Sequence, residues 1–207
     1  MKKILPYERT GDNGSNITLV FLHGSTMTKG GMYPFASVFK EYNCIVFDLT
    51  GHGQSDADEP DQISGFAEDV EYSLNQLKEQ SIVTEQVILL GYSMGGAITC
   101  EIAIRNNLNL SGIVLLSSGG DLKHYSPMID DLKAMPVEDF KTEDILYALF
   151  GIDTPEEDKK RISELFSSTK TADKTGYADL MLSNGYNNLE ACKAIKIPAL
   201  MVHGSDD

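Results

Sequence analysis

The sequence contains no tryptophan and only three cysteines among its 207 residues. Cys44, Cys100 and Cys192 are an odd number at wide spacing, which suits neither a disulfide framework nor a zinc site. Cys44 and Cys100 stand in apolar stretches, so we expect them in the core. Neither a metal nor an organic cofactor is implied.

Basic residues are also scarce, with 17 Lys and Arg against 31 Asp and Glu and a net charge of −14. Phosphate binding needs clustered Lys and Arg, and no cluster occurs, so we expect no nucleic-acid partner and no anionic membrane surface. No apolar run approaches the length of a membrane span, and the N-terminus lacks the apolar run of a signal peptide. These absences predict a cytoplasmic protein.

Apolar runs of strand length alternate with helical patterns along much of the chain. Strands are expected at residues 17–24, 44–49, 112–118 and 197–204, with a strand and its helix together at 86–106 and an edge strand within 1–10. Runs that are apolar on both faces are typical of parallel strands covered by helices. The predicted class is α/β with a mainly parallel sheet and helices on both faces.

Two helices are expected between the early strands. Residues 63–83 repeat apolar side chains at three- and four-residue steps, as in Phe66 and Val70. Residues 33–41 predict a short helix packed by Phe35, Val38 and Phe39.

The composition changes after residue 120. Residues 121–190 are acidic and contain several helical patterns but no convincing buried strand, whereas 197–204 returns to a strand pattern. We therefore divide the chain into a first core part (1–120), a helical insertion (121–190) and a resumed core (191–207). The acidity of the insertion is interpreted as a solvated face.

The stretch V-I-L-L-G-Y-S-M-G-G-A at residues 87–97 predicts a strand, a tight turn and a helix in succession, with Ser93 at the bend. In G-x-S-x-G, Gly91 and Gly95 remove side chains that would clash in such a turn, and the serine hydroxyl is left exposed at the carboxyl end of the strand. This is the place where a nucleophile is useful. Alone, the motif also fits an ordinary glycine-lined turn.

Three further motifs accompany it in order: H-G-S at 23–25, D-x-x-G-H-G-x-S at 48–55 and H-G-S-D-D at 203–207. Each stands at the carboxyl end of an expected strand. Together the four motifs resemble those of the α/β-hydrolase superfamily, and the chain looks like a small carboxylesterase or lipase-like member. The resemblance covers nearly all of 17–120 and again 197–207.

The resemblance implies roles for particular residues. Ser93 would be the nucleophile, with the backbone N–H groups of Met94 and Ser25 as donors to the oxyanion. Asp207, or less readily its neighbour Asp206, would orient the histidine that activates the serine. Both aspartates also fit a reading as simple turn residues.

None of the four histidines in the sequence is an obvious base for activating Ser93. In this fold the base follows the acid, and nothing follows Asp207 here. His23 and His52 fit structural loops, His203 precedes the acid, and His124 is the remaining candidate. We expect a fragment whose missing C-terminal strand and helices carry the base. A pseudoenzyme, or a fold completed by a partner chain at the sheet edge beside Met201, are the alternatives.

The insertion resembles the cap that such enzymes place over the serine. Tyr92 and several apolar residues of the insertion are candidates for the acyl pocket, although packing within the helices is the competing interpretation. The candidates in the insertion are Met128, Met135, Leu146, Phe150, Tyr177, Met181 and Tyr186.

The leading hypothesis is a serine hydrolase that cleaves a small or medium carboxylic ester, or a thioester, through an acyl-enzyme on Ser93. An inactive binding or interaction protein on the same fold is the alternative. C–C bond hydrolysis or a lyase step is a third possibility. Haloalkane dehalogenation is disfavoured because that chemistry needs a carboxylate in place of Ser93.

Overall fold

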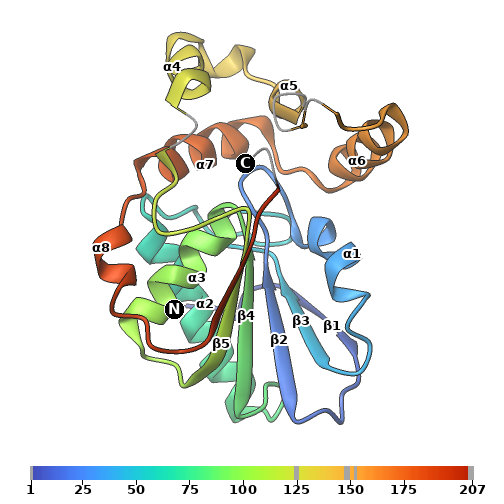
Figure 1. The fold of residues 1–207 in the computed structure, drawn as a ribbon, viewed down its shortest axis with the longest axis vertical. Coiled ribbons are helices and arrows are strands. Elements are labelled where there is room, and N and C mark those ends of the chain that lie inside the picture. The colour runs from blue at the N-terminus through green and yellow to red at the C-terminus, as the bar shows by residue number, and fades with distance from the viewer. Residues whose placement is uncertain (1, 124–125, 147–149, 152, 205–207) are drawn as a thin grey trace.

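The computed structural model describes residues 2–123, 126–146, 150–151 and 153–204, and its centre is a six-stranded sheet (Figure 1). The strand order is β1-β3-β2-β4-β5-β6, with β1 antiparallel to β3 and every other pair parallel. The strands are β1 (Tyr7–Gly11), β2 (Ile17–Leu22), β3 (Asn43–Phe47), β4 (Gln86–Tyr92), β5 (Leu110–Leu116) and β6 (Ala199–Val202). The predicted class, α/β with a mainly parallel sheet, is confirmed.

Apolar side chains on the two faces of the sheet enter two separate cores. On one face, Val20 and Ile45 pack with helices α2 (Ile63–Glu79) and α3 (Met94–Arg105). On the other face, Leu19 and Val46 pack against the segment that carries η1 (Lys29–Met32) and α1 (Tyr33–Ala36). Since neighbouring residues of a strand point to opposite faces, a continuous apolar run supplies both cores.

The helix expected at 33–41 is shorter in the structure. Helix α1 ends at Ala36, and Phe35 and Val38 are 42% and 70% exposed. Phe39 is partly buried against the sheet, as expected. The segment is too short to turn all three side chains inward.

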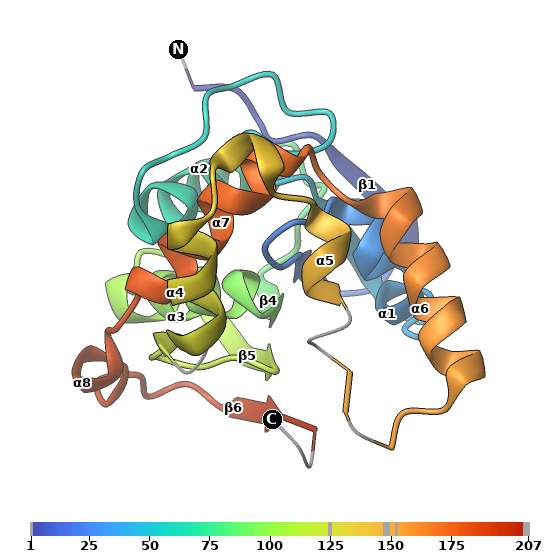
Figure 2. The same ribbon diagram turned by 90° about the horizontal axis from the view of Figure 1, so that it is seen from above.

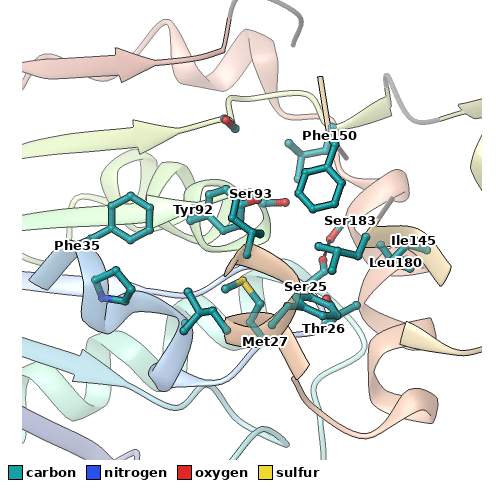
Figure 3. Close-up of a pocket in the computed structure, with 18 of the residues that line it drawn as sticks. Ser25, Thr26, Met27, Phe35, Tyr92, Ser93, Ile145, Phe150, Leu180 and Ser183 are labelled. Atoms are coloured by element: carbon teal, nitrogen blue, oxygen red, sulfur yellow. Dashed lines mark hydrogen bonds between the residues drawn. The ribbon is translucent and has the colours of Figure 1, made fainter. Parts of the chain in front are cut away.

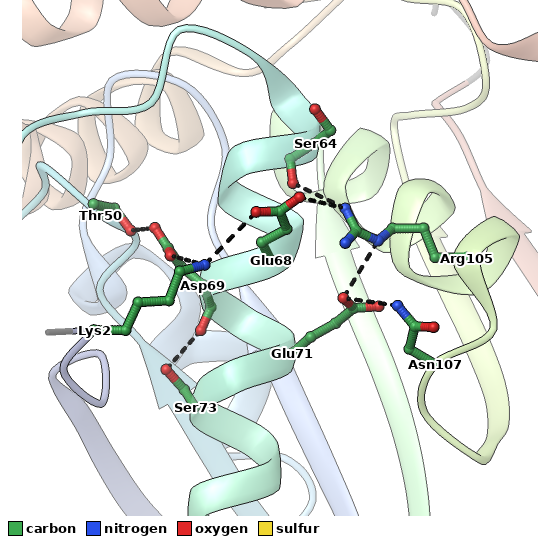
Figure 4. Close-up of polar contacts among 9 residues, drawn as sticks. All are labelled: Lys2, Thr50, Ser64, Glu68, Asp69, Glu71, Ser73, Arg105 and Asn107. Carbon is green, nitrogen blue, oxygen red and sulfur yellow. Dashed lines mark hydrogen bonds and ion pairs between the residues drawn. The ribbon is translucent and has the colours of Figure 1, made fainter.

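Helix α2 has the predicted buried stripe of Phe66, Val70 and Leu74. Its polar side chains tie it to its neighbours (Figure 4). Arg105 of α3 forms ion pairs with Glu68 and Glu71 of α2, and Thr50 donates a 2.7 Å hydrogen bond to Asp69. The glycine-rich loop that follows β3 is therefore anchored to α2.

The helical segment between β5 and β6 lies over the edge at which the parallel strands end (Figures 1 and 2). It has a small core of its own, formed by Ile129, Leu132, Phe140 and Ile145. Its elements are α4 (Ser126–Ala134), η3 (Val137–Asp139), α5 (Thr142–Leu146), α6 (Glu156–Thr169) and α7 (Asp173–Gly185), and α8 (Leu189–Cys192) leads back to the sheet. Among the described residues, no helix is both long and apolar enough to cross a bilayer.

Candidate active site

Ser93 occupies a strained bend between β4 and α3. Its φ of 50° and ψ of −118° belong to a region that residues with a side chain rarely adopt. Two hydrogen bonds hold the bend: Ser93 N–H donates to Leu116 O (3.0 Å), and Ser118 Oγ–H donates to Ser93 O (2.6 Å). The neighbouring strand β5 and the residues after it therefore fix the serine in place.

The two glycines of the motif allow this bend because backbone atoms lie where side chains would be. A Cβ at Gly91 would stand 2.2 Å from Gly95 O, and one at Gly95 would stand 2.3 Å from Leu22 O. Neither carbonyl group can move without disturbing a strand or a helix. The spacing G-x-S-x-G is thus a packing requirement of the turn.

Two backbone N–H groups stand near the serine. Met94 is the first residue of α3, so its N–H has no acceptor within the helix, and its side chain is fully buried. The loop after β2 also approaches, because a Cβ at Gly24 would lie 3.0 Å from Ser93 Cβ. Ser25 follows that glycine, and both Ser25 and Ser93 line one cavity. The assignment of Met94 and Ser25 as the oxyanion donors stays a prediction, with both residues close to Ser93 in the fold.

A cavity of about 800 Å³ opens beside Ser93, between the sheet and the helical segment (Figure 3). Most of its lining is apolar and comes from the loop after β2, from α1, and from α4 to α7. The apolar lining residues are Met27, Pro34, Phe35, Leu122, Ile129, Ile145, Leu146, Phe150, Ile162, Leu165, Phe166 and Leu180. The polar ones include Thr26, Ser117, Arg161, Ser183 and Asn184.

Some of the candidate pocket residues line the cavity and others do not. Tyr92 and Phe150 line the cavity. Tyr177 and Met181 are not among the lining residues and pack against the small core of the helical segment. Other residues of the same helix α7 line the cavity instead, namely Leu180, Ser183 and Asn184. The side chain of Met128 lies outside the described residues.

Both ring nitrogens of His23 are engaged in hydrogen bonds. Leu49 N–H donates to Nε2 (3.1 Å), so Nδ1 carries the proton and donates to Gly24 O (2.9 Å). Burial, reinforced by the charge of nearby His52, lowers the pKa of His23 to about 4. His23 is a neutral ring that fixes the loop of Ser25 beneath the site.

His52 is also fully buried, with its ring centroid 5.0 Å from that of His23. Its Nδ1 bonds to Thr50 O and its Nε2 to Asp179 Oδ2, both at 2.9 Å. Burial alone would lower the pKa of His52, but the hydrogen bond and charge of Asp179 outweigh it, and the pKa is raised. His52 therefore joins its loop to α7 as one half of a buried ion pair.

The remaining candidates stand elsewhere. His203 is exposed just after β6, whereas His124, Asp206 and Asp207 lie outside the described residues. Sequence reasoning also missed Asp179, which is fully buried beside the site. Its one signal was its position between apolar residues in an otherwise little-charged stretch of α7.

Comparisons with known proteins give a family and several relatives. The family model described as serine aminopeptidase, S33, matches residues 15–207. A putative 2-succinyl-6-hydroxy-2,4-cyclohexadiene-1-carboxylate synthase from Haemophilus influenzae is 33% identical over 110 residues, which are 52% of this chain and 43% of that protein. An (E)-2-((N-methylformamido)methylene)succinate hydrolase from Acinetobacter baylyi is 25% identical over 209 residues, 95% of this chain and 74% of that protein.

The fold is similar to that of a lipase-esterase related protein from Clostridium acetobutylicum. The TM-score is 0.82 at 26% identity, and the match covers 96% of this chain and 79% of that structure. By contrast, the match spans less than half of the Haemophilus relative.

Proposed function

The chain belongs to the family described as serine aminopeptidase, S33, within the α/β-hydrolases, and on this premise we propose that it is a serine hydrolase. It would cleave a carboxylic ester or a thioester through an acyl-enzyme on Ser93. The observation that carries the proposal is the strained Ser93 at the wall of an apolar cavity, beside the N–H groups of Met94 and Ser25.

In the proposed reaction, Ser93 Oγ attacks the carbonyl carbon while a base accepts its proton. The resulting oxyanion is held by the N–H groups of Ser25 and Met94, each worth roughly 2.7 to 4 kcal/mol in the transition state. The alcohol or thiol leaves with the proton, and water then releases the acid from the serine by the same steps. Asp207 remains the predicted acid that orients the base.

The base is proposed to be a histidine other than His23 and His52. Each of these two rings already uses both nitrogens within the fold. A general base must reach the proton that it abstracts, so neither ring is available without breaking the loops that it holds. The expected position of the base beyond residue 207 stays a prediction.

We propose that α4 to α7 form a cap over the serine and define the acyl pocket. The cavity volume of about 800 Å³ lies within the range of small-molecule sites, and its apolar lining favours an acyl chain over a polar substrate. A small or medium ester is the substrate class that fits this space.

The test is hydrolysis of short p-nitrophenyl esters by the full-length protein. Ser93→Ala should reduce the rate to that of the buffer, because the nucleophile is lost. Ser168→Ala, a serine exposed on α6, is the matched control and should leave the rate unchanged. Hydrolysis that survives Ser93→Ala would contradict the assignment.

Labelling by a fluorophosphonate probe separates the alternatives, since the probe reacts only with an activated serine. No labelling and no ester cleavage would favour the inactive binding protein. Labelling without ester cleavage would favour another reaction on the same serine. The name of the Haemophilus relative, a synthase, supports keeping that second class in the test.

A further inference from the structure

The loop that carries Ser25 is bonded to the helical segment along its whole length. Thr28 N–H donates to Thr169 O, and Thr171 N–H donates to Thr26 O, both at 2.8 Å. Met27 and Lys170 form an isolated antiparallel bridge between these two bonds. The proposed oxyanion loop is thus paired with the segment that joins α6 to α7.

Two side chains of α7, one turn apart, complete this attachment. Asp179 Oδ2 accepts the N–H of Thr26 at 2.7 Å, and Ser183 Oγ lies 2.9 Å from Ser25 Oγ. Figure 3 shows Ser25, Thr26 and Ser183 together on the wall of the cavity near Ser93. Residues i and i+4 of a helix share a face, so both side chains reach the same loop.

The loop needs such support because its backbone is strained. Thr26 has a φ of +69°, a left-handed conformation that is uncommon for a β-branched residue. Such a conformation persists only where the surrounding contacts impose it. The bond from Thr26 N–H to Asp179 is one of these contacts.

Asp179 is not explained by the folding of α7 alone. It is fully buried, and a buried carboxylate is costly unless it is well paired. Its partners are Thr26 N–H and the ring of His52, which belong to two different loops of the sheet domain. The residue therefore connects the helix to both loops at the serine.

We propose that Asp179 and Ser183 are positioning residues of the oxyanion hole, through which α7 holds the backbone of Ser25 beside Ser93. This inference rests on the proposed function. A donor of the oxyanion hole works only at about 2.7 to 3.1 Å from the oxyanion, and a displacement of about 1 Å can cost on the order of 100-fold in rate. Catalysis then depends on the helical segment for more than a substrate pocket.

The test compares Ser183→Ala, Asp179→Asn and Asp179→Ala in the full-length protein with p-nitrophenyl esters. For Asp179→Ala we expect kcat to fall by about 10- to 100-fold with little change in KM, since the ground state does not use the oxyanion hole. Asp179→Asn keeps an acceptor for Thr26 N–H and should lose less. Ser183→Ala removes only the bond to Ser25 and should lose least.

The affinity for a boronic acid inhibitor, which forms a tetrahedral adduct with the serine, separates a positioning role from a merely structural one. A change that only affected stability would leave this affinity unchanged. The affinity for the inhibitor should fall by the same factor as kcat, whereas the affinity for the alcohol product should not change. Asp173→Asn is the matched control. Among the residues that the structure describes, this carboxylate at the start of α7 contacts Thr142, Lys141 and Lys170, all within the helical segment. It should leave kcat unchanged.

The outcomes distinguish the two proposals. If the wild type neither cleaves esters nor reacts with a fluorophosphonate, the proposed function fails. If the wild type is active and both Ser183→Ala and Asp179→Asn keep their kcat and their boronic acid affinity, the positioning role is overturned while the function stands. Should Asp179→Ala not fold, those two milder variants decide the question.

Discussion

The Glu59 carboxyl group lies beside Asp179 and His52, and its surroundings favour the protonated form. Glu59 is half-buried, and burial together with the charge of Asp179 raises its pKa from about 4.5 to about 8, although His52 acts in the opposite direction. Asp179 Oδ1 is buried with no hydrogen-bond partner among the described residues. We expect the protonated Glu59 carboxyl group to donate to Asp179.

This arrangement predicts that activity falls as pH rises through about 8. Ionised Glu59 loses its hydrogen bond to Asp179 and places a second negative charge next to it, which loosens the contact with Thr26. In Glu59→Gln the amide donates at every pH, so the alkaline decline of kcat should disappear. The measurement is the pH profile of kcat between pH 6 and 10 for both proteins.

The free energy of unfolding should also depend on pH through Glu59, and the direction of this dependence can be worked out. Between about pH 4.5 and 8 the unfolded chain has released the Glu59 proton while the folded chain retains it, so the free energy of unfolding falls as pH rises. Glu59→Gln should remove this part of the slope, and Asp58→Asn, an exposed neighbour, should not. An unchanged slope in Glu59→Gln would contradict the proposed protonation.

Sequence reasoning succeeds for residues whose role depends on local chain geometry. Ser93, Gly91 and Gly95 could be placed at a strand-to-helix turn because the clash that they avoid lies within a few residues. Asp179 could not be placed, since its partner Thr26 is 153 positions away. The apolar residues on either side of Asp179 suggest that it is buried, but they do not identify its partner.

At the level of single elements, the β4–α3 turn gives a sharp test of packing. A Cβ at Gly95 would lie 2.3 Å from Leu22 O and 2.6 Å from His23 O, both backbone atoms. Gly95→Ala should therefore lower the free energy of unfolding by about 1 to 3 kcal/mol and reduce activity. Urea unfolding measures the first effect.

Gly185→Ala is the matched control because a Cβ there meets nothing within 4 Å. Its free energy of unfolding should stay the same or rise by up to about 1 kcal/mol, since alanine favours a helix over glycine. Equal stability of the two variants would mean that the turn can relax around Gly95.

Apolar periodicity predicts the long elements well and the short ones poorly. The runs that form β2 and β3 are buried on both faces, and β5 is buried or half-buried apart from Ser111, so their apolar composition indicates strands of a sheet covered on both sides. Helix α1 ends at Ala36 although the pattern continues to Phe39. A helix of one turn has too few side chains for their spacing to fix where it ends. The packing of neighbouring elements then decides its length.

At the scale of the whole molecule, the order of the motifs indicates where they meet. Parallel strands end at the same edge of a sheet, so His23, Ser25 and Ser93 were expected close together. The walls of the cavity were harder to foresee, because Leu165 and Phe166 of α6 reach it only through the path of the helical segment. That path depends on contacts between segments that are distant in the sequence.

The last prediction concerns the edge of the sheet that is formed by β6. In the part of the chain that the structure describes, strand β6 pairs only with β5, and its side chains Leu200, Met201 and Val202 are 57%, 57% and 46% exposed. In the 207-residue chain by itself we expect this edge to pair with a second copy, whereas a further strand of a longer chain, as the fragment hypothesis expects, would cover the same edge. Two copies related by a two-fold axis can align their β6 strands antiparallel and cover these side chains.

The purified chain should therefore self-associate as its concentration rises, as measured by sedimentation velocity. Val202→Lys places a charge on the edge and should shift the equilibrium toward the monomer, because lysine on an edge strand opposes pairing with another strand. Val38→Lys is the matched control, since Val38 is 70% exposed beyond α1 and away from this edge. A monomer at every concentration, or an equal shift in both variants, would show that β6 is not the site of association.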